Sequence, residues 1–347
     1  MQYRKLGNTD IDVSAICLGT MTWGEQNSQE QAFEQMDYAL SKGVNFFDTA
    51  ELYAIPAKVE TYGRTEEIIG EWFKARGNRE QVVLASKVAG PGEDWLPHIR
   101  NGRTRFNRQD IVSALDASLK RLQTDYIDLY QLHWPERKTN FFGRLGFEPE
   151  DETQFTPLLE TLQVLDEQVQ AGKIKHVGLS NETPWGVMRF LQLAEQHQLP
   201  RMMSVQNPYS LLNRSYEVGL AEISWRESIG LLAYSPLGMG TLSGKYLGGA
   251  KPANSRLTLF PDYTRYCGTA AIGATEKYVA LAREHRLDPA QMALAYVNSR
   301  PFLTSTIIGA TTMEQLKANI DSIQVQLSDE VLEGIEAIHK EHPNPSP

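Results

Sequence analysis

Hydrophobic and polar positions follow two alternating patterns along the chain. Short apolar runs rich in Val, Ile, Leu and Phe are each followed by a longer stretch whose apolar residues recur at helical spacing. We predict a strand at each of eight apolar runs: AICLGT from Ala15, VNFFD from Val44, VVLASK from Val82, YIDLYQLH from Tyr126, IKHVGLSN from Ile174, MMSVQ from Met202, GLLAYS from Gly230 and TSTIIG from Thr304. The amphipathic stretches predict helices over 28–42, 65–76, 108–123, 157–171, 184–198, 215–227, 270–286 and 312–321, with two extra helices near 289–299 and 328–341.

Start signals support three of these helices. Ser28 with Gln31 resembles a capping box, in which each side chain caps the backbone N–H of the other residue. Thr183 and Asp288 each stand directly before a proline, which is the order of a capping residue and a first-turn proline. We therefore expect helices to begin at these three points.

Eight apolar strands, each followed by a helix, predict a parallel sheet covered by helices. A doubly wound sheet would carry a GxGxxG fingerprint after its first strand, and LGTMTWGE is not one. We therefore predict an α/β fold in which residues 1–347 form a single (β/α)₈ TIM barrel. Asn8-Thr9-Asp10 predicts an N-terminal hairpin that closes the bottom of the barrel, and the Pro-rich segment 342–347 is expected to be a flexible tail.

Charge and cysteine content narrow the class of partner. The chain has 34 Lys and Arg against 43 Asp and Glu, a net charge of -9, which disfavours nucleic acid and anionic membrane surfaces. The N-terminus lacks a signal peptide's apolar core, and no run approaches the roughly 18 apolar residues of a membrane span. Cys17 and Cys267 have no CxxC or metal-ligand spacing. We expect a cytoplasmic protein.

Barrel enzymes place their chemistry at the C-terminal ends of the strands. Asp48 ends the second run with Tyr53 in the loop beyond it, Lys87 ends the third, and His133 ends the fourth. The other four strand ends carry Ser180 and Asn181, Gln206 and Asn207, Tyr234 and Ser235, and Gly309 to Thr311.

An acid, a phenol, an amine and an imidazole at one face form a set suited to proton transfer. A cationic Lys87 beside Tyr53 is expected to depress the phenol's pKa, each unit being worth about 1.4 kcal/mol. Asp48 would keep that lysine charged at a partly buried site, and His133 would orient a carbonyl. A metal-dependent hydrolase would need clustered ligands at the strand ends, where His133 is the only histidine.

The motifs LGTMTWG, FFDTAELY, LASK, DYIDLYQLHWP, IKHVGLSN, VQNPYSLLNR, LLAYSPLGMGTLSGK and IIGATTMEQLKANI occur in this order at the predicted strand ends. Over essentially the whole chain this pattern resembles the aldo-keto reductases. Within that family it is most similar to the bacterial Tas-type branch, near the group that contains potassium-channel β subunits.

The resemblance implies a barrel that binds NADPH across its open face and reduces aldehydes or ketones without a metal. Tyr53 would be the general acid, Lys87 and Asp48 its tuning partners, and His133 the group that orients the carbonyl. The resemblance also assigns the nicotinamide carboxamide to Ser180, Asn181 and Gln206, and the ring to stacking on Tyr234.

Further cofactor contacts follow from the resemblance. The glycine-rich segment YSPLGMGTLSGK offers backbone donors for the pyrophosphate. Thr312 with Gln315 resembles a capping box, and the helix start behind it suits the adenosine 2′-phosphate, with Arg256 as a neutralising charge. The expected cofactor residues are Gly19, Thr20, Met21, Asp48, Ser180, Asn181, Gln206, Tyr234, Ser235, Pro236, Leu237, Gly238, Gly240, Leu242, Ser243, Gly244, Lys245, Arg256, Gly309, Thr311, Gln315 and Asn319.

Two interpretations of function stay open. The first is an NADPH-dependent carbonyl reductase with a small-molecule substrate, for which Trp23 and Trp134 are hypothesised to line an apolar pocket. The second is a slow-turnover, nucleotide-binding regulatory or interaction protein on the same fold. Long inserts after the third and fourth strands are consistent with specificity loops, lids or oligomer contacts, and the sequence leaves the oligomeric state undecided.

Overall fold

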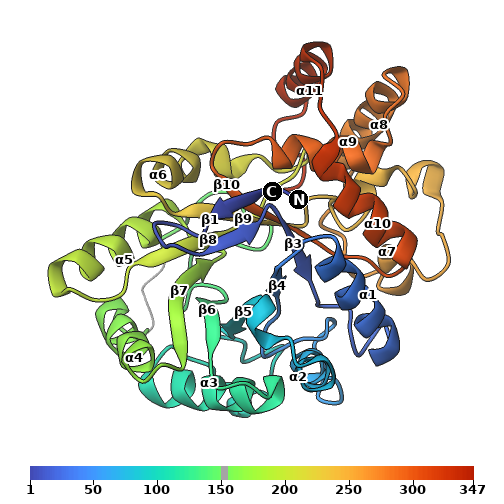
Figure 1. Cartoon of the computed structure of the whole chain (residues 1–347). Helices are drawn as coiled ribbons and strands as arrows, with labels where there is room; N and C mark the ends of the chain where they lie inside the picture. The colour runs from blue at the N-terminus through green and yellow to red at the C-terminus, as the bar shows by residue number, and fades with distance from the viewer. Residues whose placement is uncertain (150–154) are drawn as a thin grey trace.

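The chain forms a closed barrel of parallel strands. The computed structural model describes residues 1–149 and 155–347. The strands close in the order β10, β3, β4, β5, β6, β7, β8 and β9, so the last predicted strand pairs with the first (Figure 1). Their bounds are β3(Ile16–Gly19), β4(Phe46–Asp48), β5(Val83–Val88), β6(Ile127–Leu132), β7(Ile174–Ser180), β8(Met202–Pro208), β9(Gly230–Tyr234) and β10(Leu303–Ile308). The predicted (β/α)₈ barrel is confirmed.

Helices surround the barrel (Figure 1). Their bounds are α1(Gln29–Ser41), α2(Arg64–Arg76), α3(Arg108–Leu122), α4(Leu158–Gln170), α5(Pro184–His197), α6(Leu220–Glu227), α7(Arg256–Leu259), α8(Thr269–Glu284), α9(Pro289–Asn298), α10(Met313–Asp321) and α11(Asp329–Glu341). Short 3-10 turns are η1(Arg79–Gln81), η2(Arg100–Gly102), η3(Ser215–Val218), η4(Thr241–Ser243), η5(Leu247–Gly249) and η6(Ser322–Gln324). The two predicted extra helices are α9 and α11.

One predicted helix is divided. The stretch 215–227 splits at Gly219 into η3 and α6, because this residue adopts a non-helical φ of -146°. A Cβ on Gly219 would lie 3.1 Å from Cγ of Pro184, so the break coincides with close packing against the start of α5. The three start signals are confirmed: the side chains of Ser28, Thr183 and Asp288 accept backbone N–H groups at the starts of α1, α5 and α9.

The N-terminal hairpin closes one end of the barrel. β1(Tyr3–Lys5) and β2(Asp12–Ser14) pair antiparallel, as the sequence predicts. Leu6 and Val13 of this hairpin are fully buried and pack in one cluster with Phe46, Leu129 and Leu232 from the barrel strands. We call this end, where the strands begin, the bottom, and the end where they finish the mouth.

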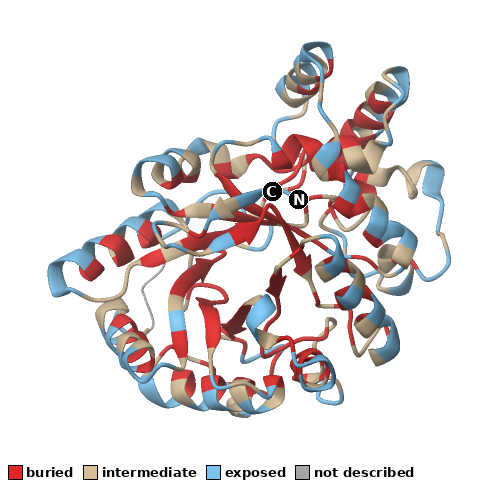
Figure 2. Ribbon diagram, in the orientation of Figure 1, coloured by how far each residue is buried: buried red, intermediate tan, exposed pale blue. Residues whose placement is uncertain are grey.

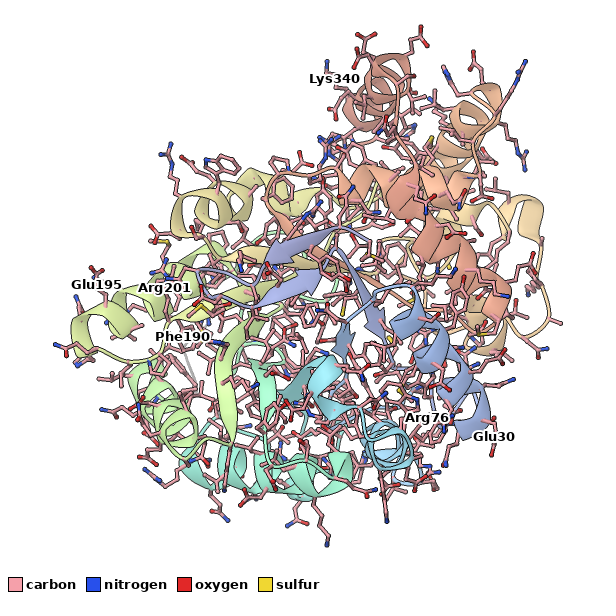
Figure 3. All side chains as sticks on the ribbon, in the orientation of Figure 1. Glu30, Arg76, Phe190, Glu195, Arg201 and Lys340 are labelled. Atoms are coloured by element: carbon pink, nitrogen blue, oxygen red, sulfur yellow. The ribbon has the colours of Figure 1, made fainter. Side chains whose placement is uncertain are left out.

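The main hydrophobic core lies between the strands and the surrounding helices. Figure 2 shows buried positions along the strands and on the inward faces of the helices, with exposed positions on the outward faces. In Figure 3 the side chains of Glu195 and Lys340 project from the outer surface of α5 and α11, whereas Phe190 of α5 is buried in the core. No helix among the described residues is both long and apolar enough to cross a bilayer.

The C-terminal segment 342–347 lies against loops of the barrel. The backbone N–H of Arg214 donates to Oδ1 of Asn344 at 2.6 Å, and the N–H of Ser346 donates to the carbonyl of Leu212 at 3.0 Å. The predicted flexible tail thus has defined contacts in the structure, and its mobility stays a prediction.

Candidate active site

The four predicted catalytic side chains meet at the mouth, three at the ends of neighbouring strands and one on a loop. Asp48 is the last residue of β4, Lys87 lies one residue before the end of β5, and His133 directly follows β6. The loop after β4 brings Tyr53 back to the same point, and all four side chains are buried. Because parallel strands finish at one end of the barrel, residues far apart in sequence converge here.

Lys87 joins two of these side chains. Its Nζ donates to Oδ2 of Asp48 at 2.6 Å and to Oη of Tyr53 at 3.3 Å. A third bond goes to the carbonyl of Thr49 at 2.8 Å, so each of the ammonium's three donors has a partner. Asp48, Lys87 and Tyr53 therefore form a hydrogen-bonded chain, in the order that the sequence argument expects.

The second oxygen of Asp48 is held by two amides. Its Oδ1 accepts from Nε2 of Gln206 at 2.7 Å and from Nε2 of Gln131 at 3.1 Å. Nε2 of Gln206 also donates to Oε1 of Gln131 at 3.1 Å. Both carboxylate oxygens are thus already bound by protein groups, which fixes the orientation of Asp48 toward Lys87.

Burial changes the expected proton affinity of Tyr53. Burial raises the pKa of Tyr53, the Lys87 charge lowers it, and the net pKa lies above the ordinary tyrosine value. The depression of the Tyr53 pKa expected from Lys87 alone is therefore wrong, because burial outweighs the lysine charge. Burial also lowers the pKa of Lys87, but Asp48 and Tyr53 raise it further than burial lowers it. At neutral pH the phenol is therefore protonated and the lysine charged.

His133 lies beside the phenol as a neutral ring. Its centroid is 5.8 Å from that of Tyr53, in an edge-to-face arrangement with an interplanar angle of 77°. Burial, with a smaller contribution from the Lys87 charge, holds the pKa of His133 well below its usual value. Its Nδ1 is buried and has no hydrogen-bond partner within the described part of the chain. A neutral imidazole can both donate and accept, which suits it to orient a polar oxygen.

The residues expected to hold the carboxamide form one network. Nδ2 of Asn181 donates to the carbonyl of His133 at 2.9 Å and to Oγ of Ser180 at 3.1 Å. Oη of Tyr234 donates to Oδ1 of Asn181 at 2.6 Å, and Oγ of Ser180 donates to the carbonyl of Gln206 at 2.9 Å. The structure therefore brings the ends of β7, β8 and β9 together beside His133.

The loop after β3 lies next to the catalytic group. Gly19 is the last residue of β3, and Oγ1 of Thr20 donates to the carbonyl of Asp48 at 2.8 Å. The carbonyl of Met21 accepts the N–H of Ile55, two residues after Tyr53, at 2.9 Å. These bonds attach the loop after β3 to the segment that carries the phenol.

The loop after β9 supplies a backbone suited to close approach. We call residues 235–245 the belt. Gly238, Gly240 and Gly244 have φ values of 53°, 89° and 79°, where any other residue would be strained. A Cβ on Gly240 would lie only 2.9 Å from Nζ of Lys245. The expected cofactor residues on the belt are Ser235, Pro236, Leu237, Gly238, Gly240, Leu242, Ser243, Gly244 and Lys245.

Two features of this region suit phosphate groups. Neither Lys245 nor Arg256 has a carboxylate partner within 4.0 Å among the residues with assigned positions; the Arg256 guanidinium lies near Sδ of Met21 and Oε1 of Gln26. Burial lowers the pKa of Arg256, which an added anion would offset. Oγ1 of Thr241 is buried and has no hydrogen-bond partner among residues 1–149 and 155–347. The Leu242 side chain packs in the core, so its predicted cofactor contact would be made by its backbone, and this contact stays a prediction.

The start of α10 differs from the expected capping box. The side chain of Thr312 accepts the N–H of Gln315, as predicted. Oε1 of Gln315, however, accepts the N–H of Thr311 at 3.0 Å instead of that of Thr312. Nδ2 of Asn319 donates to the carbonyl of Gly309 at 3.2 Å, so the expected residues of this segment are held together around the turn after β10.

The two tryptophans of the pocket hypothesis have different environments. Trp23 is fully buried in the core between barrel and helices, and its Nε1 donates to Oε1 of Gln35 at 3.0 Å. It does not line a mouth pocket, because α1 covers it. Trp134 packs in a separate cluster with Tyr53, and its ring lies 5.2 Å from that of Trp95. Part of the insert after β6, residues 150–154, lies outside the described residues.

Comparison with known proteins decides the family. A sequence model described as "Aldo/keto reductase family" matches residues 15–340. The chain belongs to the aldo/keto reductase family. Members of this family are oxidoreductases that act on carbonyl compounds and generally use a nicotinamide cofactor.

Relatives of this aldo-keto reductase have varied descriptions. "Protein tas" of Escherichia coli is 53% identical over 347 residues, covering 100% of both chains. "Uncharacterized oxidoreductase YrpG" of Bacillus subtilis is 36% identical over 335 residues, covering 96% of this chain and 94% of its own. A "Probable voltage-gated potassium channel subunit beta" of Arabidopsis thaliana is 29% identical over 354 residues, covering 99% and 98%. The similarity to the Tas-type branch is confirmed.

Sequence reasoning missed several residues of this aldo-keto reductase that contact its site. Gln131 lies two residues before His133, on the face of β6 that carries inward side chains, so strand periodicity was a usable signal. Burial raises the pKa of Tyr234 and the charge of Arg265 lowers it; Arg265 lies on an irregular loop with no periodic signal. Glu51 and Arg100, which pair behind the Tyr53 loop, are 49 residues apart, and nothing local connects them.

Proposed function

We propose that this aldo-keto reductase reduces aldehydes or ketones to alcohols with NADPH, and that Tyr53 is the proton donor. The observation that carries the proposal is the buried chain from Asp48 through Lys87 to Tyr53, with a neutral His133 beside the phenol. A donor, a group that stabilises its conjugate base and a group that orients the acceptor are what carbonyl reduction requires.

Each side chain has a defined part in this reaction. A nicotinamide cofactor held by Ser180, Asn181 and Gln206 would, when bound, supply the hydride for the carbonyl carbon. His133, neutral because its pKa is well below the usual value, orients the carbonyl oxygen. Tyr53 then gives its Oη proton to that oxygen, and the Lys87 ammonium 3.3 Å away stabilises the phenolate that remains. Asp48 holds Lys87 in place and balances its charge.

The residues around the mouth fit a dinucleotide phosphate. Gln206 uses Nε2 for Asp48 and Gln131, which leaves Oε1 to accept from a carboxamide. The belt offers backbone donors, and Lys245 with Arg256 provides positive charge without a protein carboxylate within 4.0 Å in the described ranges. This surplus of positive charge supports NADPH over NADH, because NADPH carries the additional 2′-phosphate.

The first experiment is a fluorescence titration of the purified protein with NADPH and NADH, followed by absorbance measurements of NADPH oxidation against a panel of aldehydes and ketones. Tighter binding of NADPH and turnover on at least one carbonyl are expected, with EDTA leaving the rate unchanged. Equal binding of the two nucleotides would contradict the cofactor assignment.

A second candidate function is that of a nucleotide-binding regulatory protein with slow turnover. It is supported by the 29% identical relative described as a probable potassium channel subunit beta. Tight NADPH binding without oxidation across the whole panel would favour this function.

The two free cysteines and the charge of -9 support a cytoplasmic location, which cell fractionation would test.

A further inference from the structure

A buried ion pair lies behind the loop that carries Tyr53. Glu51, two residues before this tyrosine, is fully buried. Arg100 holds its carboxylate with two hydrogen bonds, 2.7 Å to Oε2 and 2.8 Å to Oε1. Tyr62 donates a further bond to Oε2 at 3.2 Å. Because an unpaired carboxylate is costly to bury, the guanidinium is what permits Glu51 to occupy this position.

Glu51 fastens the Tyr53 loop to the end of β5. Its N–H donates to the carbonyl of Lys87 at 3.2 Å, and its Oε1 accepts the N–H of Ala89 at 2.6 Å. The N–H of Tyr53 donates to the carbonyl of Ala50 at 3.1 Å, so the phenol is one tight turn away from this attachment. The attachment involves β5, which also carries the Lys87 ammonium that contacts the phenol.

Arg100 connects a second loop to the same point. It lies in η2, on the loop after β5, whereas Glu51 lies on the loop after β4. The pair therefore links two loops of adjacent strands at the mouth, beside the end of β5 that carries Lys87. A bidentate pair fixes direction as well as distance, which a single hydrogen bond does not.

We propose that Glu51, neutralised by Arg100, is a positioning residue that holds the Tyr53 hydroxyl against the Lys87 ammonium. The inference rests on the proposed function, since it assigns Glu51 to the same proton transfer. A misplacement of a reacting group by about 1 Å lowers a rate by about 100-fold. Loss of the Glu51 attachment acts on this distance while the cofactor residues stay in place.

The first test is Glu51→Gln, which keeps the side-chain shape but replaces one acceptor oxygen with a donor that faces Arg100. We expect kcat to fall by about 10- to 100-fold and KM for the carbonyl to change by less than about threefold. The alkaline limb of the pH profile should also move to higher pH, because Lys87 lowers the pKa of Tyr53 less when the two separate.

The matched control is Asp128→Asn. Asp128 is also a buried carboxylate that pairs with an arginine and accepts a backbone N–H of β5, but it lies at the bottom of the barrel. We expect this variant to lose stability and to keep its kcat and pH profile. Equal losses of kcat in both variants would show a general effect of stability and overturn the proposal.

A double variant separates positioning from stability. Glu51→Met with Arg100→Met removes both charges together, and replacing a whole buried pair by apolar side chains generally preserves stability. We expect this protein to unfold near the wild-type temperature but to keep the lowered kcat, because Ala89 loses its acceptor. Recovery of kcat together with stability would mean that the pair is only structural.

A further measurement needs no turnover. In protein labelled with 3-fluorotyrosine, the ¹⁹F resonance of Tyr53 is identified by its absence in Tyr53→Phe. We expect Glu51→Gln to shift this resonance and Asp128→Asn to leave it unchanged; an unmoved resonance in Glu51→Gln would overturn the proposal. If the wild-type protein reduces no carbonyl, the proposed function fails, while this spectrum still decides whether Glu51 positions Tyr53.

Discussion

Both ends of β5 are anchored by a buried carboxylate that pairs with an arginine, but only the mouth end lies beside the proposed catalytic residues. At the bottom, Oδ2 of Asp128 accepts the N–H of Leu84 at 3.0 Å and pairs with Arg79 at 2.8 Å. At the mouth, Glu51 accepts a backbone N–H just beyond β5 and pairs with Arg100. Each anchor is a buried carboxylate that binds one arginine and one backbone amide, with a further bond from Lys175 to Asp128 and from Tyr62 to Glu51.

The difference lies in what each anchor joins. Asp128 belongs to β6, so the bottom anchor ties one strand to its neighbour. Glu51 belongs to a loop, so the mouth anchor ties a strand to a segment that carries Tyr53. In a barrel the strands and the bottom face provide the rigid frame, and the loops at the mouth present reactive groups. The comparison predicts that substitutions at the two ends separate activity from stability.

The largest expected effect is at the mouth. Tyr53→Phe removes the hydroxyl but keeps the ring that packs near His133 and Trp134. We expect kcat for carbonyl reduction to fall by about 1,000-fold, because the proton donor is lost. NADPH affinity, measured by fluorescence, should stay within about threefold, because the phenol acts on the substrate oxygen. Retention of most of the turnover would remove the assignment of Tyr53.

Lys87→Met should reduce kcat by about 100-fold and also change the pH dependence. Lys87 lowers the pKa of Tyr53, so its removal raises that pKa further above the ordinary value. The acid then stays protonated to higher pH, and the alkaline decline of kcat/KM shifts upward. Steady-state rates across a pH series would measure this. A decline at the wild-type pH would argue against coupling between the two groups.

The corresponding substitution at the bottom, Asp128→Asn, should act on stability. Breaking one side of a buried ion pair costs about 3 kcal/mol. Urea unfolding followed by circular dichroism would report this loss, with assays at a temperature where the protein stays folded. If Asp128→Asn lowered kcat as much as Glu51→Gln does, the two ends of β5 would not differ in their effect on activity.

The smallest expected effect comes from a substitution near the mouth that leaves the proposed catalytic side chains unchanged. Ser28→Ala removes the N-cap of α1, the helix that follows the loop after β3. The substitution does not alter Asp48, Lys87, Tyr53 or His133. We expect a loss of about 1 kcal/mol in unfolding free energy and an unchanged kcat. If Ser28→Ala lowered kcat as much as Tyr53→Phe does, any substitution near the mouth would reduce kcat, and the assignment of a special role to Tyr53 would fail.

Much of the fold could be predicted because its signals are local. Apolar runs marked the eight strands, and helical periodicity with caps such as Ser28 and Asp288 marked the helices. Gly219 was missed because its break coincides with packing against Pro184, a contact between two helices. Local patterns carry no information about such contacts.

The site was predictable in part for a related reason. Asp48, Lys87 and His133 were found because each stands at or beside a strand end, and barrels bring strand ends together. Glu51 and Arg100 were not found, because neither stands at a strand end and their pairing depends on how two loops pack. Trp23 was misplaced for the converse reason, since a position near a strand end does not reveal which side chain a helix covers.

The sequence by itself determined the strands, most of the helices and the polar side chains at the strand ends, because periodicity and strand ends are properties of neighbouring residues. Only the tertiary structure decided which of those side chains touch. Asp48 and Gln206 lie 158 residues apart and share a hydrogen bond because the barrel closes. The tertiary structure also decided the pKa of Tyr53, since burial by distant segments raises it more than the charge of the adjacent lysine lowers it.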